Sequence, residues 1–324
     1  MLKTVHNARL SAAIGAAFWL VLLFIRTGDS SETELIQKIL LLGILVIVPL
    51  GFALVPVTPM EHDSLLYRAA ISAQPVAAVA SAFSFLLSPG QPAAILALSW
   101  LLVTTVMGAF GLRRILKRGP SFSHEIFVDA ALLYLPIGAA WFVASRFGLQ
   151  PMGFGDTIVL LTATHFHFAG FAAPILAGLV GRSMIGVGQT IHAMFVLAGI
   201  CIVGGTPLVA AGITFSPMLA LAGAAVISIG LTLLAILVFG WVLNKVNSFL
   251  AQTLLVVSSL SNIAAMVLAC LYAYSLITKI VIVDIPQMAM THGILNSLGF
   301  ALCGLIGWTV ASRAEETRSR IDTK

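Results

Sequence analysis

The sequence predicts an all-α membrane protein, a polytopic bundle of about ten transmembrane helices with both ends of the chain in the cytoplasm. Composition is the first observation: 60% of the 324 residues are hydrophobic and only 9% are charged, whereas a soluble domain carries about 25% charged residues. The charges also separate long apolar runs. This pattern is typical of helices in lipid, because each backbone amide must be bonded within its own segment there.

Apolar runs of spanning length, about 20 residues each, predict the individual helices. The first five are expected at residues 10–26, 36–57, 66–87, 92–112 and 126–146. The second five are expected at residues 157–180, 184–206, 217–241, 250–277 and 287–311. Proline and glycine break the helical pattern near Pro56–Pro59 and Pro207–Pro217, so boundaries are least sharply defined there.

The basic residues give the third observation and the orientation. With ten spans and an inward N-terminus, all but four of the 17 Lys and Arg residues fall on the cytoplasmic side; the exceptions are Arg26, Lys38, Arg146 and Lys279. Cytoplasmic loops of membrane proteins carry such an excess. Because these residues lie at helix ends, the basic pI of about 9.4 indicates topology and contact with the lipid bilayer, not binding to nucleic acid.

No linker long enough to separate domains is present. Residues 1–312 are therefore expected to form a single transmembrane bundle, and residues 313–324 a polar cytoplasmic tail.

Histidines inside the apolar runs are the main functional candidates, because ionisable residues are costly in a membrane. His165 and His167 lie in the sixth run, and at 1.5 Å per residue from Asp156 His165 is about 13 Å deep, near the midplane. Residues two apart on a regular helix point about 200° from each other, so both face one pocket only if the helix is locally unwound. Pro174 favours such local unwinding of the helix, since it removes the backbone amide that would bond the Gly170 carbonyl.

Two later helices carry polar pairs that share a face. Gln189 and His192 are three residues apart, and His292 and Asn296 are four apart. We expect His165, His192, His292 and Asn296 to lie at similar depths, where they could converge. Imidazole is both a common metal ligand and a proton carrier, so the sequence suggests catalytic roles for His165, His292 and Asn296, and metal ligation by His165, His167, His192 and His292. Each of these residues could equally be a hydrogen-bonded packing residue.

A second polar layer lies nearer the cytoplasm. Asp129 follows Glu125 by four residues, and either binds substrate or pairs with Arg68, Arg113 or Arg114 in a structural salt bridge. Together with Asp129, the predicted substrate-binding residues are Gln74, Thr164 and Gln189. Asn262 and the Thr104–Thr105 pair are expected to bond one helix to another. The remaining histidines, His6, His62 and His124, fall in loops or at helix ends and are expected to be solvated.

Two motifs resemble the YndJ-like family of bacterial membrane proteins. The first is the run His165-Phe166-His167-Phe168-Ala169-Gly170-Phe171, preceded by Leu160-Leu161-Thr162-Ala163. The second is Thr291-His292-Gly293-Ile294-Leu295-Asn296-Ser297-Leu298-Gly299-Phe300, and the similarity extends over most of the third to tenth spans. The resemblance implies a multi-pass protein of the bacterial inner membrane and adds weight to the histidines and to Asn296. Members are sometimes labelled transporters without a defined substrate.

Three functions fit these residues. The favoured one is an intramembrane enzyme acting on a lipophilic substrate such as an isoprenoid, carotenoid, quinone or acyl lipid, because short loops leave entry from the lipid as the simplest route. Alternatives are a multi-pass transporter of a small solute, as the family label suggests, and a protein that binds haem or a metal non-covalently. The sequence does not identify a cofactor. The histidine pattern would fit a bound metal ion.

Overall fold

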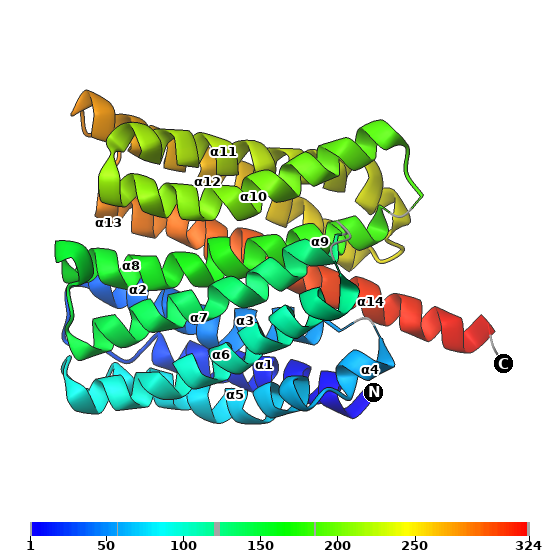
Figure 1. Cartoon of the computed structure of the whole chain (residues 1–324), viewed down its shortest axis with the longest axis horizontal. Helices are drawn as coiled ribbons and strands as arrows, with labels where there is room; N and C mark the ends of the chain where they lie inside the picture. The colour runs from blue at the N-terminus through cyan, green and yellow to red at the C-terminus, as the bar shows by residue number, and fades with distance from the viewer. Residues whose placement is uncertain (1, 57, 120–123, 185, 323–324) are drawn as a thin grey trace. The chain divides into compact units, whose positions relative to one another are not determined.

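The computed structural model of the chain describes residues 2–56, 58–119, 124–184 and 186–322 (Figure 1). Within these ranges every regular element is helical, so the predicted all-α class is confirmed. The chain divides into two compact units, Met1–Ile175 and Leu176–Lys324. The boundary falls inside a helix, α9 (Ala173–Ser183). That residues 1–312 act as a single bundle stays a prediction.

The first unit holds the helices that precede this boundary. In chain order they are α1 (Leu2–Leu22), α2 (Ser31–Leu42), η1 (Gly43–Ile47), α3 (Val48–Ala53), α4 (Pro59–His62), α5 (Leu65–Ser84), α6 (Gln91–Arg118), α7 (Glu125–Phe147), η2 (Pro151–Gly153), α8 (Asp156–His165) and η3 (Phe166–Ala172). The ends follow local chemistry: Ser30 caps α2 by accepting a hydrogen bond from the Thr33 amide, and Gly148 ends α7 in the left-handed conformation.

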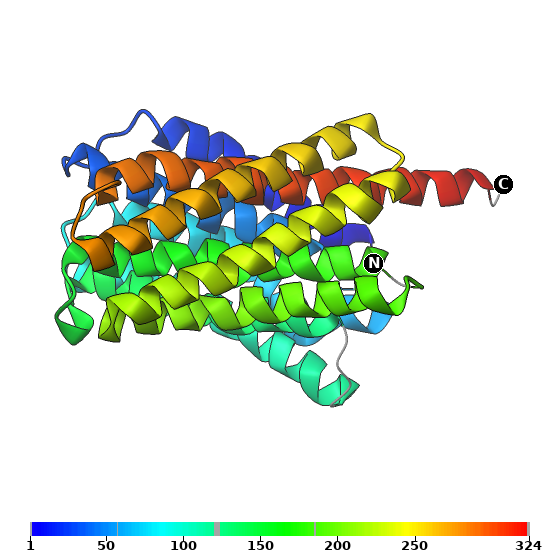
Figure 2. The same cartoon turned by 90° about the horizontal axis from the view of Figure 1, so that it is seen from above.

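The second unit begins in α9. It continues with α10 (Gln189–Phe215), α11 (Pro217–Leu237), η4 (Val238–Val242), η5 (Leu243–Lys245), α12 (Phe249–Thr278), α13 (Ile285–Met288), η6 (Ala289–Gly293), η7 (Leu295–Leu302) and α14 (Cys303–Asp322). The long helices α10, α11 and α12 pack in sequence order, and Figure 2 shows them side by side. Close packing depends on glycine: a Cβ atom on Gly205 of α10 would lie 2.8 Å from the Cβ atom of Ile227 on α11.

Eight helical segments of the described chain are long and apolar enough to cross a membrane, by length and composition. They are Ser31–Ala53, Gln91–Arg118, Glu125–Phe147, Asp156–Ser183, Gln189–Phe215, Pro217–Lys245, Phe249–Thr278 and Ile285–Ala314. The remaining two predicted spans coincide with α1 and α5, helices of 21 and 20 residues. The prediction of about ten spans therefore agrees roughly with the structure, while the cytoplasmic placement of both ends stays a prediction.

One predicted span is displaced along the chain. Residues 184–206 were expected to be helical up to Pro207, but α10 starts at Gln189 and continues through Pro207 to Phe215. Gly188 serves as the N-cap and the preceding Gly186 has a positive φ of 82°, which keeps this segment out of the helix. Transmembrane helices tolerate an internal proline because other groups take up the freed carbonyl.

Five segments of the described chain are wound as π-helix: η1, η3, η4, η6 and η7. Such winding accounts for well under 1% of residues in globular proteins and is enriched at functional sites. In η3 the Ala173 amide bonds the Phe168 carbonyl, five residues back, immediately before Pro174. Both motif runs fall largely in these segments, His165–Phe171 at η3 and Thr291–Phe300 at η6 and η7. The motifs therefore share an unusual backbone as well as their histidines.

Candidate functional site

His167 lies in the core of the first unit. Its side chain is completely buried. Its Nδ1 lies 2.8 Å from the Ala163 carbonyl and its Nε2 lies 2.9 Å from the indole Nε1 of Trp100 on α6. A carbonyl only accepts and an indole N–H only donates, so the ring is neutral with its proton on Nδ1. Both nitrogens are thus bonded, and the geometry is that of a packing residue.

Glycines make room for this residue on two neighbouring helices. Gly43, at the start of η1, faces the ring, and a Cβ atom there would lie 3.3 Å from the Cβ atom of His167. A Cβ atom on Gly138 of α7 would lie 3.1 Å from Nδ1 of His167 and 2.7 Å from the Cβ atom of Phe166. The histidine can therefore sit in the core only because α7 and η1 approach η3 through glycine.

Gly138→Ala is expected to destabilise the protein by about 1–3 kcal/mol, the usual cost of overpacking a filled core. The added methyl group would lie too close to Phe166 for either helix to keep its position. Thermal unfolding in detergent measures the effect. Gly204→Ala in α10 is the control, since nothing lies within 4 Å of its Cβ position. Equal melting temperatures for the two variants would contradict the predicted close packing.

His165 differs from its neighbour. Its side chain is exposed on the surface of the chain, and its Nδ1 lies 2.8 Å from the carbonyl of Leu161, one turn back in α8. The two histidines of the first motif thus have different environments, as the 200° separation of alternate helical residues predicts. Thr164 between them is buried, and its hydroxyl donates to the Leu160 carbonyl of its own helix.

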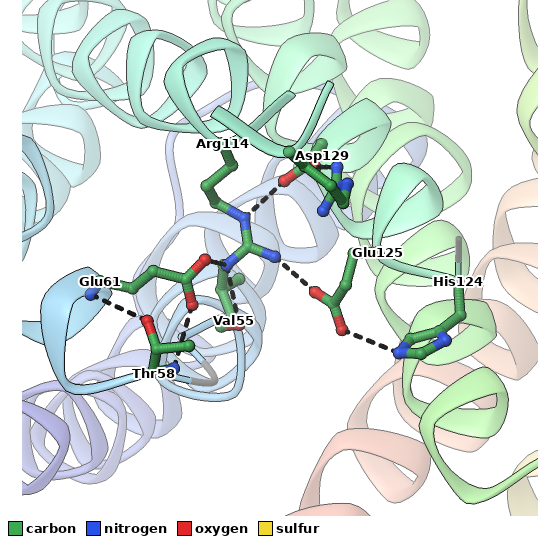
Figure 3. A network of polar contacts seen from close by, with 8 residues as sticks. Val55, Thr58, Glu61, Arg114, His124, Glu125 and Asp129 are labelled. Atoms are coloured by element: carbon green, nitrogen blue, oxygen red, sulfur yellow. Dashed lines mark hydrogen bonds and ion pairs between the residues drawn. The ribbon is translucent and has the colours of Figure 1, made fainter. Parts of the chain in front are cut away.

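The second polar layer is an ion-pair cluster centred on Arg114 of α6 (Figure 3). The guanidinium donates to Asp129 from Nε at 2.6 Å, to Glu61 from Nη1 at 2.6 Å, and to Glu125 from Nη2. Arg118, one turn further along α6, bonds the other oxygen of Asp129. We call these five residues the Arg114 cluster.

The Arg114 cluster connects three helices. Glu61 belongs to α4 and also closes a capping box there: its Oε2 accepts from the Thr58 amide at 3.2 Å. Glu125 and Asp129 stand one turn apart at the start of α7. Asp129 is completely buried with both oxygens bonded to arginine. The predicted structural salt bridge with Arg114 is therefore present, and these contacts account for Asp129 without a substrate.

Gln74 also has a structural environment. Its side chain is 3% exposed, its Oε1 accepts from the Ser11 hydroxyl at 2.6 Å, and its Nε2 donates to the Ile44 carbonyl at 3.2 Å. These bonds join α5 to α1 and η1. As a result, the amide predicted to bind substrate connects three helices of the first unit.

The expectation that His62 is solvated is wrong. The residue ends α4 and is 6% exposed, with its ring centroid 5.8 Å from that of Tyr67. Tyr67 belongs to α5, so the ring of His62 contacts the next helix of the chain, which the sequence pattern does not reveal. Burial lowers the pKa of His62 from its ordinary value, because the charged imidazolium loses hydration.

His292 and Asn296 form a hydrogen-bonded pair in the second unit. Nδ1 of His292 lies 2.9 Å from the Ala265 carbonyl of α12, which places the proton on Nδ1. Nε2 lies 3.0 Å from the side-chain nitrogen of Asn296. Both side chains are half-buried. The predicted sharing of one face is therefore present, on π-helical rather than α-helical backbone.

Gln189 and His192 lie elsewhere along their helix. Gln189 is the first residue of α10, so His192 is in the first turn, about 5 Å from the helix start. Both side chains are exposed, and the His192 ring lies 6.3 Å from that of Phe195. His192 thus lies in the first turn of α10, because the helix begins five residues later than the apolar pattern suggests. Its depth in the membrane stays a prediction.

Metal ligation by the histidines is not supported by their grouping. Among the residues that the structure describes, no group of three or more His, Cys, Asp or Glu side chains could hold a metal ion. His167 would have to break a hydrogen bond to ligate one. Metal binding by His165, His167, His192 and His292 stays a prediction.

Several contacts of these sites were not predicted from the sequence. Trp100 was not linked to His167, since no pattern connects residues 67 positions apart. Arg118 could have been predicted as a partner of Asp129, because it follows Arg114 by one helical turn on the same face.

The residues expected to bond one helix to another differ in outcome. Asn262 does bond α12 to α11, through the Leu231 carbonyl at 3.0 Å. Thr104 and Thr105 do not bond between helices as expected, since both hydroxyls donate within α6.

Comparisons with known proteins agree with the motifs. The family model described as YndJ-like protein matches residues 38–300. The Bacillus subtilis (strain 168) protein named Uncharacterized membrane protein YndJ is 29% identical over 286 residues, which cover 87% of this chain and 50% of that protein. The chain thus spans about half the length of this relative. No solved structure matches the chain.

Proposed function

The chain belongs to the YndJ-like family, and from the geometry of its second motif we propose that it is an intramembrane enzyme acting on a lipophilic substrate, with His292 as general base. The observation that carries the proposal is the orientation of the His292 ring. Because Nδ1 donates to the Ala265 carbonyl, Nε2 holds the lone pair that can accept a proton.

Asn296 supplies the positioning group in this proposal. Its side-chain nitrogen lies 3.0 Å from Nε2 of His292 and 3.2 Å from the His292 backbone carbonyl. A substrate hydroxyl or acidic C–H group that displaces the amide would meet Nε2 directly, while the freed amide could donate to a developing negative charge. The pair would thus abstract a proton and stabilise the resulting anion.

The setting of the pair supports a lipophilic substrate. His292 and Asn296 lie within the candidate span Ile285–Ala314, and both side chains are half-buried. His292 is about 10 Å from the start of this span at 1.5 Å per residue. An isoprenoid, carotenoid, quinone or acyl lipid already occupies that depth of the inner membrane and could approach the pair by lateral diffusion. A polar solute would need a hydrated path.

Lipid composition tests the proposal even while the substrate is unidentified. Membranes of a bacterial host expressing the wild type, His292→Ala or Asn296→Ala would be extracted and compared by mass spectrometry. Loss of a general base lowers rates by about 10²–10⁴-fold, so at least one lipid species formed with the wild type should fall to background with His292→Ala. Asn296→Ala should reduce it less, since the base remains.

Thr253→Val is the control, because Thr253 is exposed on α12 and its hydroxyl bonds its own helix. Membrane levels and melting temperatures of all variants must match the wild type. Identical lipid profiles for wild type and His292→Ala at equal protein levels would contradict the enzyme proposal.

Transport of a small solute is the second proposal, favoured by the five π-helical segments and by the prolines inside α5, α7 and α10. Such helices can shift their hydrogen-bond register, as a moving carrier requires. A carrier would leave lipid composition unchanged in the experiment above. It would also require Gln74→Ala and Asp129→Asn to alter solute uptake at unchanged melting temperature, whereas their contacts predict a loss of stability.

A further inference from the structure

A small cavity in the second unit contains an unsatisfied polar atom. Its volume is about 20 Å³, and it is lined in part by Leu176, Leu234, Leu255, Asn262, Phe300 and Trp308. Asn262 is 1% exposed, and its side-chain nitrogen donates to the Leu231 carbonyl. Its oxygen, Oδ1, is buried without a hydrogen-bond partner. A buried acceptor left in this state costs about 1–3 kcal/mol.

The cavity walls offer further oxygen atoms. Ser258 and Ser259 both line it. The Ser258 hydroxyl donates to the Phe300 carbonyl of η7 at 2.8 Å, so its oxygen remains able to accept a second bond. Ser259 is 5% exposed and carries a hydroxyl that can donate or accept. The site thus presents mainly acceptors, and a ligand that fits it must donate hydrogen bonds.

Size and charge restrict the ligand further. A space of about 10–15 Å³ is sufficient for one water molecule, which needs two to four polar partners. The cavity lining contains no carboxylate. A bare cation in this apolar surrounding would lose its hydration without a compensating charge. A neutral donor of the size of water meets both restrictions.

We propose that this cavity is a binding site for one water molecule, held by Asn262 Oδ1 and the adjacent serine hydroxyls between α11, α12 and η7. The water completes the hydrogen bonding of Asn262, whose other end already fixes α12 to α11. It also lies in the seam where Ser258 bonds η7. The site is independent of the catalytic proposal for His292.

The test is a structure of the full chain in lipid nanodiscs, at a resolution that shows ordered waters. The expected result is one density peak at hydrogen-bonding distance, about 2.5–3.0 Å, from Asn262 Oδ1. The peak should persist when sodium is replaced by choline throughout purification. It should disappear in Asn262→Leu and remain in Thr253→Val, on the exposed face of the same helix.

Two results would overturn the proposal. A peak that is lost in choline would identify a sodium ion in place of water. An empty cavity in the wild-type map would show a dry site. Thermal unfolding gives a second test. If the cavity holds water, Asn262→Leu removes the hydrogen bonds to that water and should not raise the melting temperature. A clear rise would indicate that the cavity is dry and that the substitution removes an unsatisfied oxygen.

Discussion

Arg114→Ala is expected to be among the most damaging single substitutions in the chain, lowering the free energy of unfolding by about 3–5 kcal/mol. Removal of the guanidinium would leave Glu61, Glu125 and Asp129 without the cation that donates to all three. Asp129 is completely buried. Its second oxygen would keep the bond to Arg118, but a buried carboxylate that loses one of two cationic partners must either stay charged in a poor solvent or take up a proton.

Thermal unfolding of the purified protein in one detergent would measure this loss. Chromatographic homogeneity would identify variants that fail to fold. Arg113→Ala is the matched control: this neighbouring arginine donates to the Ser64 hydroxyl and is not part of the Arg114 cluster. Asp129→Asn in the Arg114→Ala background should recover part of the loss, since it removes a buried charge that has lost one of its two arginine partners and keeps only Arg118. Two results would contradict the cluster: strictly additive effects of Arg114→Ala and Asp129→Asn on the free energy of unfolding, or equal losses of stability in Arg114→Ala and Arg113→Ala.

His167→Ala is expected to cost about 2–5 kcal/mol of unfolding free energy, whereas His165→Ala should have little effect on stability. The first substitution opens a cavity in the core of the first unit and leaves the Trp100 indole N–H without its acceptor. The second removes an exposed ring whose Nδ1 bonds the Leu161 carbonyl, one turn back in its own helix. Two histidines of one motif therefore serve as each other's control.

The melting temperatures of the two variants provide the measurement. Trp100→Phe adds an independent test, because it retains most of the ring volume and leaves Nε2 of His167 without a donor, at a cost of about 1–3 kcal/mol. If His167→Ala unfolded at the wild-type temperature while changing the lipid profile of the membrane, the packing interpretation would be wrong and His167 would belong to the functional site.

The local features that the sequence predicted correctly depend on composition and helical period. Apolar runs identified every long helix, because lipid forces a helix wherever about 20 apolar residues follow one another. The His292–Asn296 pair and the Arg114–Asp129 salt bridge were also foreseeable. The first follows from four-residue spacing on one helix. The second was one of three pairings that the sequence left open for Asp129, with Arg68, Arg113 or Arg114, and the structure shows that Arg114 is the partner.

Helix boundaries were predicted less well where glycine interrupts an apolar run. The chain from residue 184 looks apolar enough to be helical, yet α10 begins at Gln189 after a glycine with positive φ. This shift places His192 in the first turn of α10, where the sequence pattern predicted a position further along the helix. Hydropathy reports which residues prefer lipid, but it does not report backbone conformation.

The environment of each polar side chain was decided by the tertiary structure. His165 and His167 are chemically identical in the sequence, and only the approach of α6 and α7 buries one ring against Trp100 while leaving the other exposed. The Asn262 cavity likewise arises where several helices meet without filling the space. A sequence specifies which residues can bond along one helix, because the period is fixed. Contacts between helices depend on side-chain shape at distances that no local pattern encodes, so the roles of these residues became visible only in the folded chain.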